Sequence, residues 1–175
     1  MKARKMKVDE LLRLAERGGA TGSRLIKSRD VVVRDWVRFK CQFGCPNYGQ
    51  RLTCPPYSPT PDQTRKILGE YGEAMLLEFR EDNGRKWRSV NKAMVNLERE
   101  VFLAGYPASI GMASGPCHFC EKCDLEGCVH PHLARPSMES CGIDVFATAR
   151  NAGFQIEVVK NRKQKPIHFG LLLIE

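Results

Sequence analysis

The eight cysteines of this 175-residue chain, gathered in two segments, limit how it can fold more than any other feature. Three of them lie in residues 41–61 and five in residues 117–141. The first segment also holds five prolines and two glycines, a composition typical of loops. We therefore predict two cysteine-rich loops, at 41–61 and 117–141, within a single domain that spans residues 1–175.

The overall composition is that of an ordinary globular protein, with 42% hydrophobic and 27% charged residues. Apolar runs such as residues 171–174 are far shorter than the roughly 20 residues needed to cross a bilayer. The basic N-terminus has no apolar core behind it, so we expect a cytoplasmic protein with no membrane partner. Cysteines stay reduced in that compartment, which favours metal ligation by thiolates over disulfides.

The second loop has the more regular cysteine spacing. Its first four cysteines follow the pattern C-x2-C-x2-C-x4-C and are Cys117, Cys120, Cys123 and Cys128. Bacterial ferredoxins wrap a cubane cluster with C-x2-C-x2-C-x3-C-P, which differs by one residue and by the position of the proline. Because tetrahedral zinc more often uses two separated C-x2-C pairs, the spacing favours iron–sulfur over zinc.

The first loop has the pattern C-x3-C-x8-C-P-P, formed by Cys41, Cys45 and Cys54. Gly44 and Gly49 permit unusual backbone dihedrals and the prolines fix others, as a rigid loop around a cluster requires. Backbone amides between the cysteines can then point at cluster sulfurs. The C-x3-C-x2-C pattern of radical S-adenosylmethionine enzymes is not met, since the third cysteine lies too far along the chain.

Three cysteines in the first loop and five in the second region make two sets of four if one cysteine crosses over. We predict two 4Fe-4S clusters, one held by Cys117, Cys120 and Cys123 and the other by Cys41, Cys45 and Cys54. Cys128 and Cys141 then supply the fourth ligands, in an order that the spacing leaves open. Cys141 is expected near the first turn of a helix, where the helix dipole favours a thiolate and Gly142 leaves space for a cluster. The alternatives are one cluster with spare cysteines, a zinc site, and structural thiols.

Several motifs, taken in order, resemble a prokaryotic family. They are Cys41-x3-Cys45, Cys54-Pro55-Pro56, Cys117-x2-Cys120-x2-Cys123, and the run Arg135-Pro136-Ser137-Met138-Glu139-Ser140-Cys141-Gly142-Ile143-Asp144. The family consists of predicted metal-binding proteins called domain of unknown function 2284, and the resemblance extends from residue 37 to the C-terminus. It implies a cysteine-bound metal centre of the iron–sulfur type and supplies no reaction.

Outside the loops, apolar periodicity predicts an α/β or α+β fold with a small mixed β-sheet flanked by helices. Helices are expected at 7–18, 61–71, 87–104 and 137–152, with Thr60 and Ser137 as N-caps of the second and fourth. Extended segments are expected at 29–40, 74–79, 108–113, 154–159 and 168–174.

Other chemistry-bearing residues have plainer interpretations. His130 and His132 flank a proline near Cys128 and could ligate a metal, but eight available cysteines favour a polar loop. Arg135 could donate to a cluster sulfur or form a surface salt bridge. The basic segment 160–165 has no interleaved aromatics, so we expect a solvated turn and no nucleic-acid partner.

The sequence therefore predicts an iron–sulfur protein that carries electrons, or serves a larger anaerobic redox system, rather than a catalyst. The formal net charge of +8 favours an acidic partner such as a ferredoxin or flavodoxin. The alternatives are a zinc-stabilised binding module and an enzyme with an open iron–sulfur site.

Overall fold

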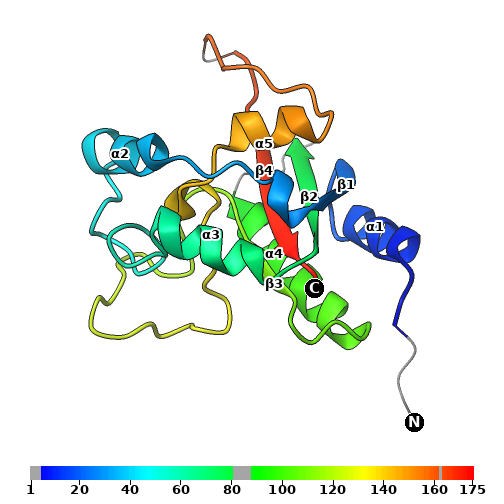
Figure 1. Cartoon of the computed structure of the whole chain (residues 1–175). Coiled ribbons are helices and arrows are strands. Elements are labelled where there is room, and N and C mark those ends of the chain that lie inside the picture. Colours follow the sequence, from blue (N-terminus) through cyan, green and yellow to red (C-terminus); the bar gives the residue numbers. More distant parts are fainter. Residues whose placement is uncertain (1–4, 81–87, 162) are drawn as a thin grey trace.

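A four-stranded antiparallel sheet, in the order β1-β2-β4-β3, forms the centre of the part of the chain that the computed structural model describes, residues 5–80, 88–161 and 163–175 (Figure 1). The strands are β1 (Gly22–Lys27), β2 (Glu73–Arg80), β3 (Ile110–Met112) and β4 (Ile167–Leu173). The helices are α1 (Val8–Arg17), α2 (Asp35–Gly44), α3 (Pro61–Gly69), α4 (Arg88–Leu103) and α5 (Val145–Asn151), with short 3-10 helices η1 (Ser28–Asp30) and η2 (Glu139–Cys141). Trp87, at which the third expected helix begins, lies outside the described residues.

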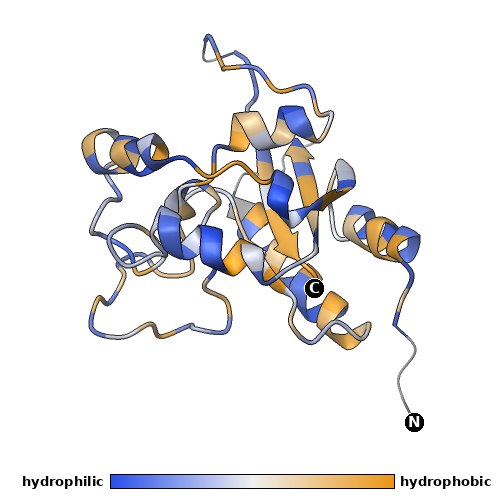
Figure 2. Cartoon of the chain, viewed as in Figure 1, coloured by the Kyte–Doolittle hydropathy of each residue, from blue (hydrophilic) through white to orange (hydrophobic). Residues whose placement is uncertain are grey.

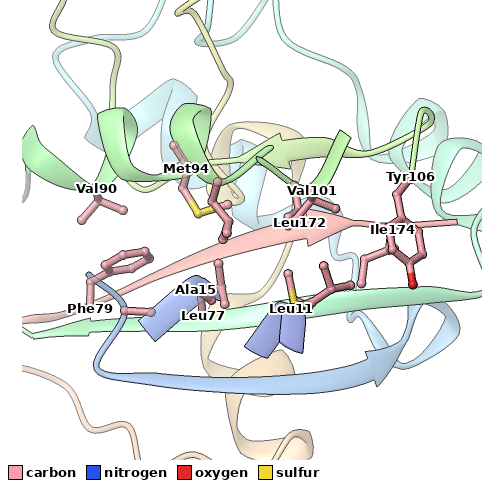
Figure 3. Packing of buried hydrophobic residues seen from close by; sticks show 14 residues of the cluster. Leu11, Ala15, Leu77, Phe79, Val90, Met94, Val101, Tyr106, Leu172 and Ile174 are labelled. Atoms are coloured by element: carbon pink, nitrogen blue, oxygen red, sulfur yellow. The ribbon is translucent and has the colours of Figure 1, made fainter. Parts of the chain in front are cut away.

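One face of the sheet packs against α1 and α4 (Figure 3). Along β2, Met75, Leu77 and Phe79 point to this face, at the two-residue spacing of a strand. They meet Leu11 of α1 and Met94 of α4, both fully buried. This side of the core is thus closed by the two helices that the sequence predicted with the clearest periodicity.

The other face carries a second hydrophobic cluster that includes residues of α3, α5 and η2. Leu76 of β2 and Leu171 of β4 pack there with Leu68 of α3 and Ala149 of α5. The central strands β2 and β4 are therefore apolar on both faces, and Figure 2 shows them mostly in the hydrophobic colour. The turn η2 enters this cluster, which links the cysteine region to the core.

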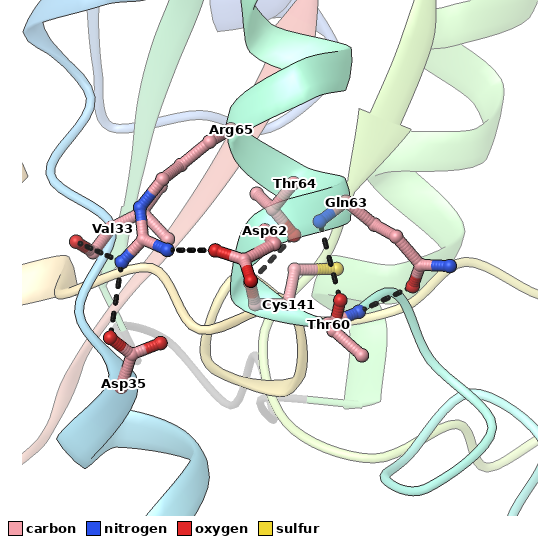
Figure 4. Close-up of polar contacts among 8 residues, drawn as sticks. All are labelled: Val33, Asp35, Thr60, Asp62, Gln63, Thr64, Arg65 and Cys141. Atoms are coloured by element: carbon pink, nitrogen blue, oxygen red, sulfur yellow. Dashed lines mark hydrogen bonds and ion pairs between the residues drawn. The ribbon is translucent and has the colours of Figure 1, made fainter.

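Helix α3 begins where the sequence predicted, at a capping box (Figure 4). The Thr60 hydroxyl accepts from the Gln63 amide at 3.2 Å, and the Gln63 side chain accepts from the Thr60 amide at 2.8 Å. Pro61 occupies the first turn, where a missing N–H costs nothing. One turn later, the buried Thr64 hydroxyl donates to the Cys141 carbonyl oxygen at 2.7 Å, so α3 also holds the end of η2.

The α+β class is confirmed, but the sheet ladders between described strands are all antiparallel rather than mixed. The expected extended segment 29–40 is wrong in most of its length, because α2 begins at Asp35 and β1 precedes it. Trp36, Phe39 and Phe43 fall three and four residues apart, a helical spacing that the β-branched run before them obscured. The first cysteine, Cys41, therefore lies on a helix and not in a loop.

The expected helix at 137–152 is two elements, η2 and α5, separated by Gly142. Gly142 has a φ of +80°, and Asp144 caps the new helix by accepting from the Ala147 amide at 3.0 Å. The expected N-cap at Ser137 is wrong, because the N-cap of η2 is Met138; the Ser137 hydroxyl does accept from the Ser140 amide at 3.1 Å. Residues 154–159 form no strand in the described chain.

The described part of the chain contains no helix with both the length and the apolar character needed to cross a membrane.

Gly142 should be the least replaceable glycine near the site. A Cβ at this position would lie 2.8 Å from Cγ of Pro61, and the left-handed backbone adds strain. We expect Gly142→Ala to lower the free energy of unfolding by about 1–3 kcal/mol, measured by urea titration.

The matched control is Gly69→Ala in α3, where a Cβ meets nothing within 4 Å. This change should be neutral, or stabilising by up to about 1 kcal/mol through helix propensity. Equal stability of the two variants would contradict the proposed role of Gly142.

Candidate metal centre

The three cysteines of the first loop are placed by the end of α2 and by a series of tight turns. Cys41 lies in the last turn of α2, and Cys45 follows directly after its end. Cys54 is buried, and its carbonyl oxygen accepts from the amides of Tyr57 and Ser58 at 3.0 and 3.1 Å. Gly49, with a φ of +69°, turns the loop back so that its amide donates to the Pro55 carbonyl oxygen.

These three thiols line a common cavity of about 200 Å³. Its remaining wall comes from Asn47, Tyr48, Pro55, Gly115, Pro116, Ser137, Glu139 and Ser140. Burial, and then the neighbouring Cys45, raise the pKa of the Cys54 thiol to about 11 and also raise the pKa of Cys41. A thiolate in this cavity therefore needs a nearby positive charge, which a bound metal would supply.

In the second loop, Cys120 and Cys128 lie near Cys117. Burial raises the pKa of the Cys117 thiol; the Phe119 amide lowers it, while the nearby Cys120 and Cys128 raise it. Residues 119–129 of the described chain make no backbone-to-backbone hydrogen bond. Side-chain contacts and turns therefore determine the conformation of this segment.

The two loops lie side by side, although about seventy residues separate them (Figure 1). The Arg51 guanidinium donates to the carbonyl oxygens of Cys120 and Glu121 at 3.2 and 3.4 Å. The Leu52 amide donates to the Cys123 sulfur at 3.5 Å. A backbone amide pointed at a cysteine sulfur was expected within a loop, and here it reaches across from one loop to the other.

Cys141 lies apart from both groups, fully buried in the second hydrophobic cluster with Met138 and Ile143. Burial raises the pKa of its thiol to about 12, and the charges that act on it are those of Arg38 and Glu139. The space expected beside Gly142 is filled by the Pro61 ring. Its role as a ligand stays a prediction, and the surroundings are those of a small apolar side chain.

Glu139 instead faces the cavity of the first loop. Its Oε2 atom is buried with no hydrogen-bond partner among the described residues. Burial raises the pKa of this carboxyl; the Ser137 hydroxyl and the backbone amides of Glu139 and Gly115 lower it. The Cys41 sulfur is 4.0 Å from the Glu139 carbonyl oxygen. A buried carboxylate oxygen without a partner is costly, which points to a ligand.

Arg38 connects the first loop to η2. Its guanidinium donates to the carbonyl oxygens of Pro59 and Ser140, both at 2.7 Å. The buried Ser58 hydroxyl donates to the same Ser140 oxygen at 2.7 Å. One side chain of α2 therefore ties the first loop to η2.

Arg135 binds the carboxylate of Glu98 and not a cysteine sulfur. It pairs with Glu98 of α4 through two bonds of 2.7 and 2.6 Å, with both side chains mostly buried. This ion pair fixes the end of the second loop. His130 and His132 lie in that loop with their rings 6.3 Å apart, and His168 contacts Ser114 of the sheet region.

The cavity of the first loop has ligands and room for a metal group. Among residues 5–80, 88–161 and 163–175, no three histidine, cysteine or acidic side chains converge closely enough to hold one ion. Tetrahedral zinc with Zn–S bonds of about 2.3 Å needs sulfurs within about 4 Å of one another. The 200 Å³ cavity greatly exceeds the roughly 10–15 Å³ that one water molecule needs. Thiols around such a space fit a larger group, so the residues present fit an iron–sulfur cluster.

A larger cavity of about 500 Å³ shares Cys41, Cys45 and Glu139 with the smaller one. Most of its other wall is apolar, with Val37, Ile143, Ile156, Val158, Ile167 and Phe169 among its lining residues. Its volume and lining are those of small-molecule sites.

The sequence reasoning missed Glu139, Arg38 and Arg51. A signal existed for the arginines, since each stands three residues before a cysteine of the first loop, Cys41 and Cys54. Glu139 is the one acidic residue in the run 135–143, but nothing local shows that it is buried.

Comparison with known proteins gives a family and no closer relative. A family model described as "Predicted metal-binding protein (DUF2284)" matches residues 24–174, a span that contains all eight cysteines. No curated protein and no solved structure matches the chain significantly.

The burial of Cys141 predicts its reactivity in the reduced, metal-free protein. With a pKa of about 12, its thiolate fraction rises tenfold per pH unit through the alkaline range and is small at pH 8. We expect iodoacetamide to modify Cys141 roughly 100-fold more slowly than Cys123 at pH 8, followed by peptide mass spectrometry.

Unfolding in urea should remove the difference, which provides the control. Equal modification rates in the folded protein would mean that Cys141 is accessible and would contradict its placement in the core.

Proposed function

The chain belongs to the DUF2284 family of predicted metal-binding proteins, and on this premise we propose that its two cysteine loops bind two 4Fe-4S clusters that transfer electrons one at a time. The observation that carries the proposal is the cavity of about 200 Å³ walled by Cys41, Cys45 and Cys54. The second loop would hold the other cluster with Cys117, Cys120, Cys123 and Cys128. The eighth ligand is Cys141 by the sequence prediction.

The residues around the loops support the holding of negatively charged clusters. The Leu52 amide already points at the Cys123 sulfur, and Arg51 lies between the loops. Such donors stabilise thiolates and tune the potential of a bound cluster. The contact between the loops also supports a short path for electrons from one cluster to the other.

A docking surface for the redox partner is offered by α2, which carries Cys41. Trp36, Phe39 and Phe43 are 47%, 64% and 69% exposed, and the rings of Phe39 and Phe43 contact each other at a tilt, with centroids 4.6 Å apart. Lys40 lies over the Trp36 ring at 4.9 Å. Exposed aromatics beside a cation, on a chain of net charge +8, suit an acidic ferredoxin or flavodoxin in the cytoplasm.

A second candidate function is catalysis at an open iron–sulfur site. The 500 Å³ cavity favours it, because its wall includes Cys41 and Cys45 and its lining is mostly apolar. A small apolar substrate in this cavity would meet the cluster of the first loop. The zinc-stabilised module is tested by the same measurement as the clusters.

Metal content provides the direct test. Anaerobically reconstituted protein should be brown and hold about eight irons and eight sulfides per chain. The double variant Cys117→Ala/Cys120→Ala should keep about four irons, since it removes ligands of one cluster only.

A colourless wild-type protein that contains zinc would overturn the iron–sulfur proposal. Wild-type protein with about four irons would leave a single cluster.

Metal removal should destabilise the loops more than the sheet. A cluster links segments distant in sequence, and the second loop has few hydrogen bonds of its own. Chelation should lower the melting temperature by roughly 5–15 °C, the shift expected when a cross-link worth a few kcal/mol is lost.

Amide hydrogen exchange should locate that loss. Protection in β2 and β4 should persist, while 45–58 and 115–135 lose theirs. An apo-protein that melts at the holo temperature would show that the cysteines are peripheral to stability.

A further inference from the structure

We propose that the carboxylate of Glu139 is the fourth ligand of the first metal site, where it completes the set Cys41, Cys45 and Cys54 with an oxygen donor. The inference rests on the proposed metal-binding function and goes beyond it, because it replaces a predicted thiolate ligand by a carboxylate. Cys141 then serves as a core residue.

Glu139 is positioned next to the three cysteines of the first loop. Glu139 lines the same cavity of about 200 Å³ as the three cysteines. Its backbone carbonyl oxygen lies 4.0 Å from the Cys41 sulfur. Glu139 therefore belongs to the wall of the cavity that the three cysteines share.

One carboxylate oxygen of Glu139 lacks a hydrogen-bond partner among the described residues. Its buried Oε2 has no hydrogen-bond donor among the described residues, although nearly all buried polar atoms in folded proteins have one. A metal would supply the missing partner of Oε2.

The geometry of η2 separates the two candidate ligands, Glu139 and Cys141. Three residues make one turn of a 3-10 helix, so Glu139 and Cys141 point to different sides. Cys141 enters the cluster of Met138 and Ile143, while Glu139 faces the cavity. Figure 4 shows Cys141 beside the start of α3, whose Thr64 binds its carbonyl oxygen. To ligate the same metal, Cys141 would have to leave the core.

The location of Glu139 also gives its site a distinct property. Glu139 lines both the small cavity and the 500 Å³ cavity, so the oxygen-ligated corner faces the larger space. An oxygen donor suits cluster iron less well than a thiolate does. An added ligand would therefore replace the Glu139 carboxylate before it replaces a cysteine thiolate.

The test compares full-length variants after anaerobic reconstitution. Glu139→Gln keeps the shape but loses the anionic ligand, so we expect a loss of about one iron in eight and a three-iron signal in electron paramagnetic resonance after mild oxidation. Glu139→Cys should restore the four-iron state with an altered spectrum. Cys141→Ala should keep the wild-type iron content.

Glu157→Gln is the matched control, because Glu157 is exposed and lines the larger cavity but not the small one with the three cysteines. It should leave iron content and spectrum unchanged. Wild-type iron and spectrum in Glu139→Gln, or cluster loss in Cys141→Ala with its far-ultraviolet circular dichroism intact, would overturn the proposal. If Glu139→Gln does not fold, Glu139→Cys decides: failure to regain four irons would count against ligation.

The proposed function and this inference can fail separately. If wild-type protein binds zinc and no iron, the iron–sulfur function is wrong, and cobalt substitution then tests the ligand set. Thiolate-to-cobalt absorption that corresponds to three cysteines in the first site, and is changed by Glu139→Cys, would retain the inference. Absorption unaffected by both Glu139 variants would overturn it.

Discussion

The position of η2 depends on backbone hydrogen bonds to two segments that are distant in sequence, and the candidate site depends on η2. On one side, Ala113 after β3 donates to the Pro136 carbonyl oxygen at 2.8 Å and accepts from the Met138 amide at 3.0 Å. On the other side, the Arg34 amide donates to the Gly142 carbonyl oxygen at 2.9 Å. The turn is thus clamped between the sheet and the start of α2. Without this clamp neither Glu139 nor Cys141 would have a defined direction.

The residues that form the apolar core and the candidate metal ligands lie mostly in different parts of the molecule. The sheet and its helices bury two apolar clusters that use β2 and β4 on both faces. The cysteine loops lie beside this core, held by arginines: Arg38 to η2, Arg51 between the loops, and Arg135 to Glu98. Arginine suits this role because one planar group can bind several carbonyl or carboxylate oxygens at once. The core positions the loops, and a metal in the loops would complete their order.

Much of the fold could be predicted from the sequence where local signals agree. The capping box at Thr60, the apolar run of β2 and the helical periodicity of α1 and α4 are local properties, and the structure confirms the elements they predicted. The errors arose where a local signal was outweighed. Three successive valines suggested a strand before α2, and a serine cap suggested a long helix that Gly142 interrupts. The family resemblance was also correct.

The sequence by itself determined that this is a metal-binding chain, because cysteine spacing and loop-forming residues are properties of the local chain. It also indicated which segments would be helical or extended, since periodicity reflects which side chains can be buried together. Only the tertiary structure decided that the sheet is antiparallel, that Glu139 lines the cavity of the first loop, and that Cys141 is buried in the core. The physical reason is that burial and proximity arise from contacts between distant segments. The environment that drives Cys141 into the core and leaves Glu139 beside three thiols is made by α2, α3 and the sheet together.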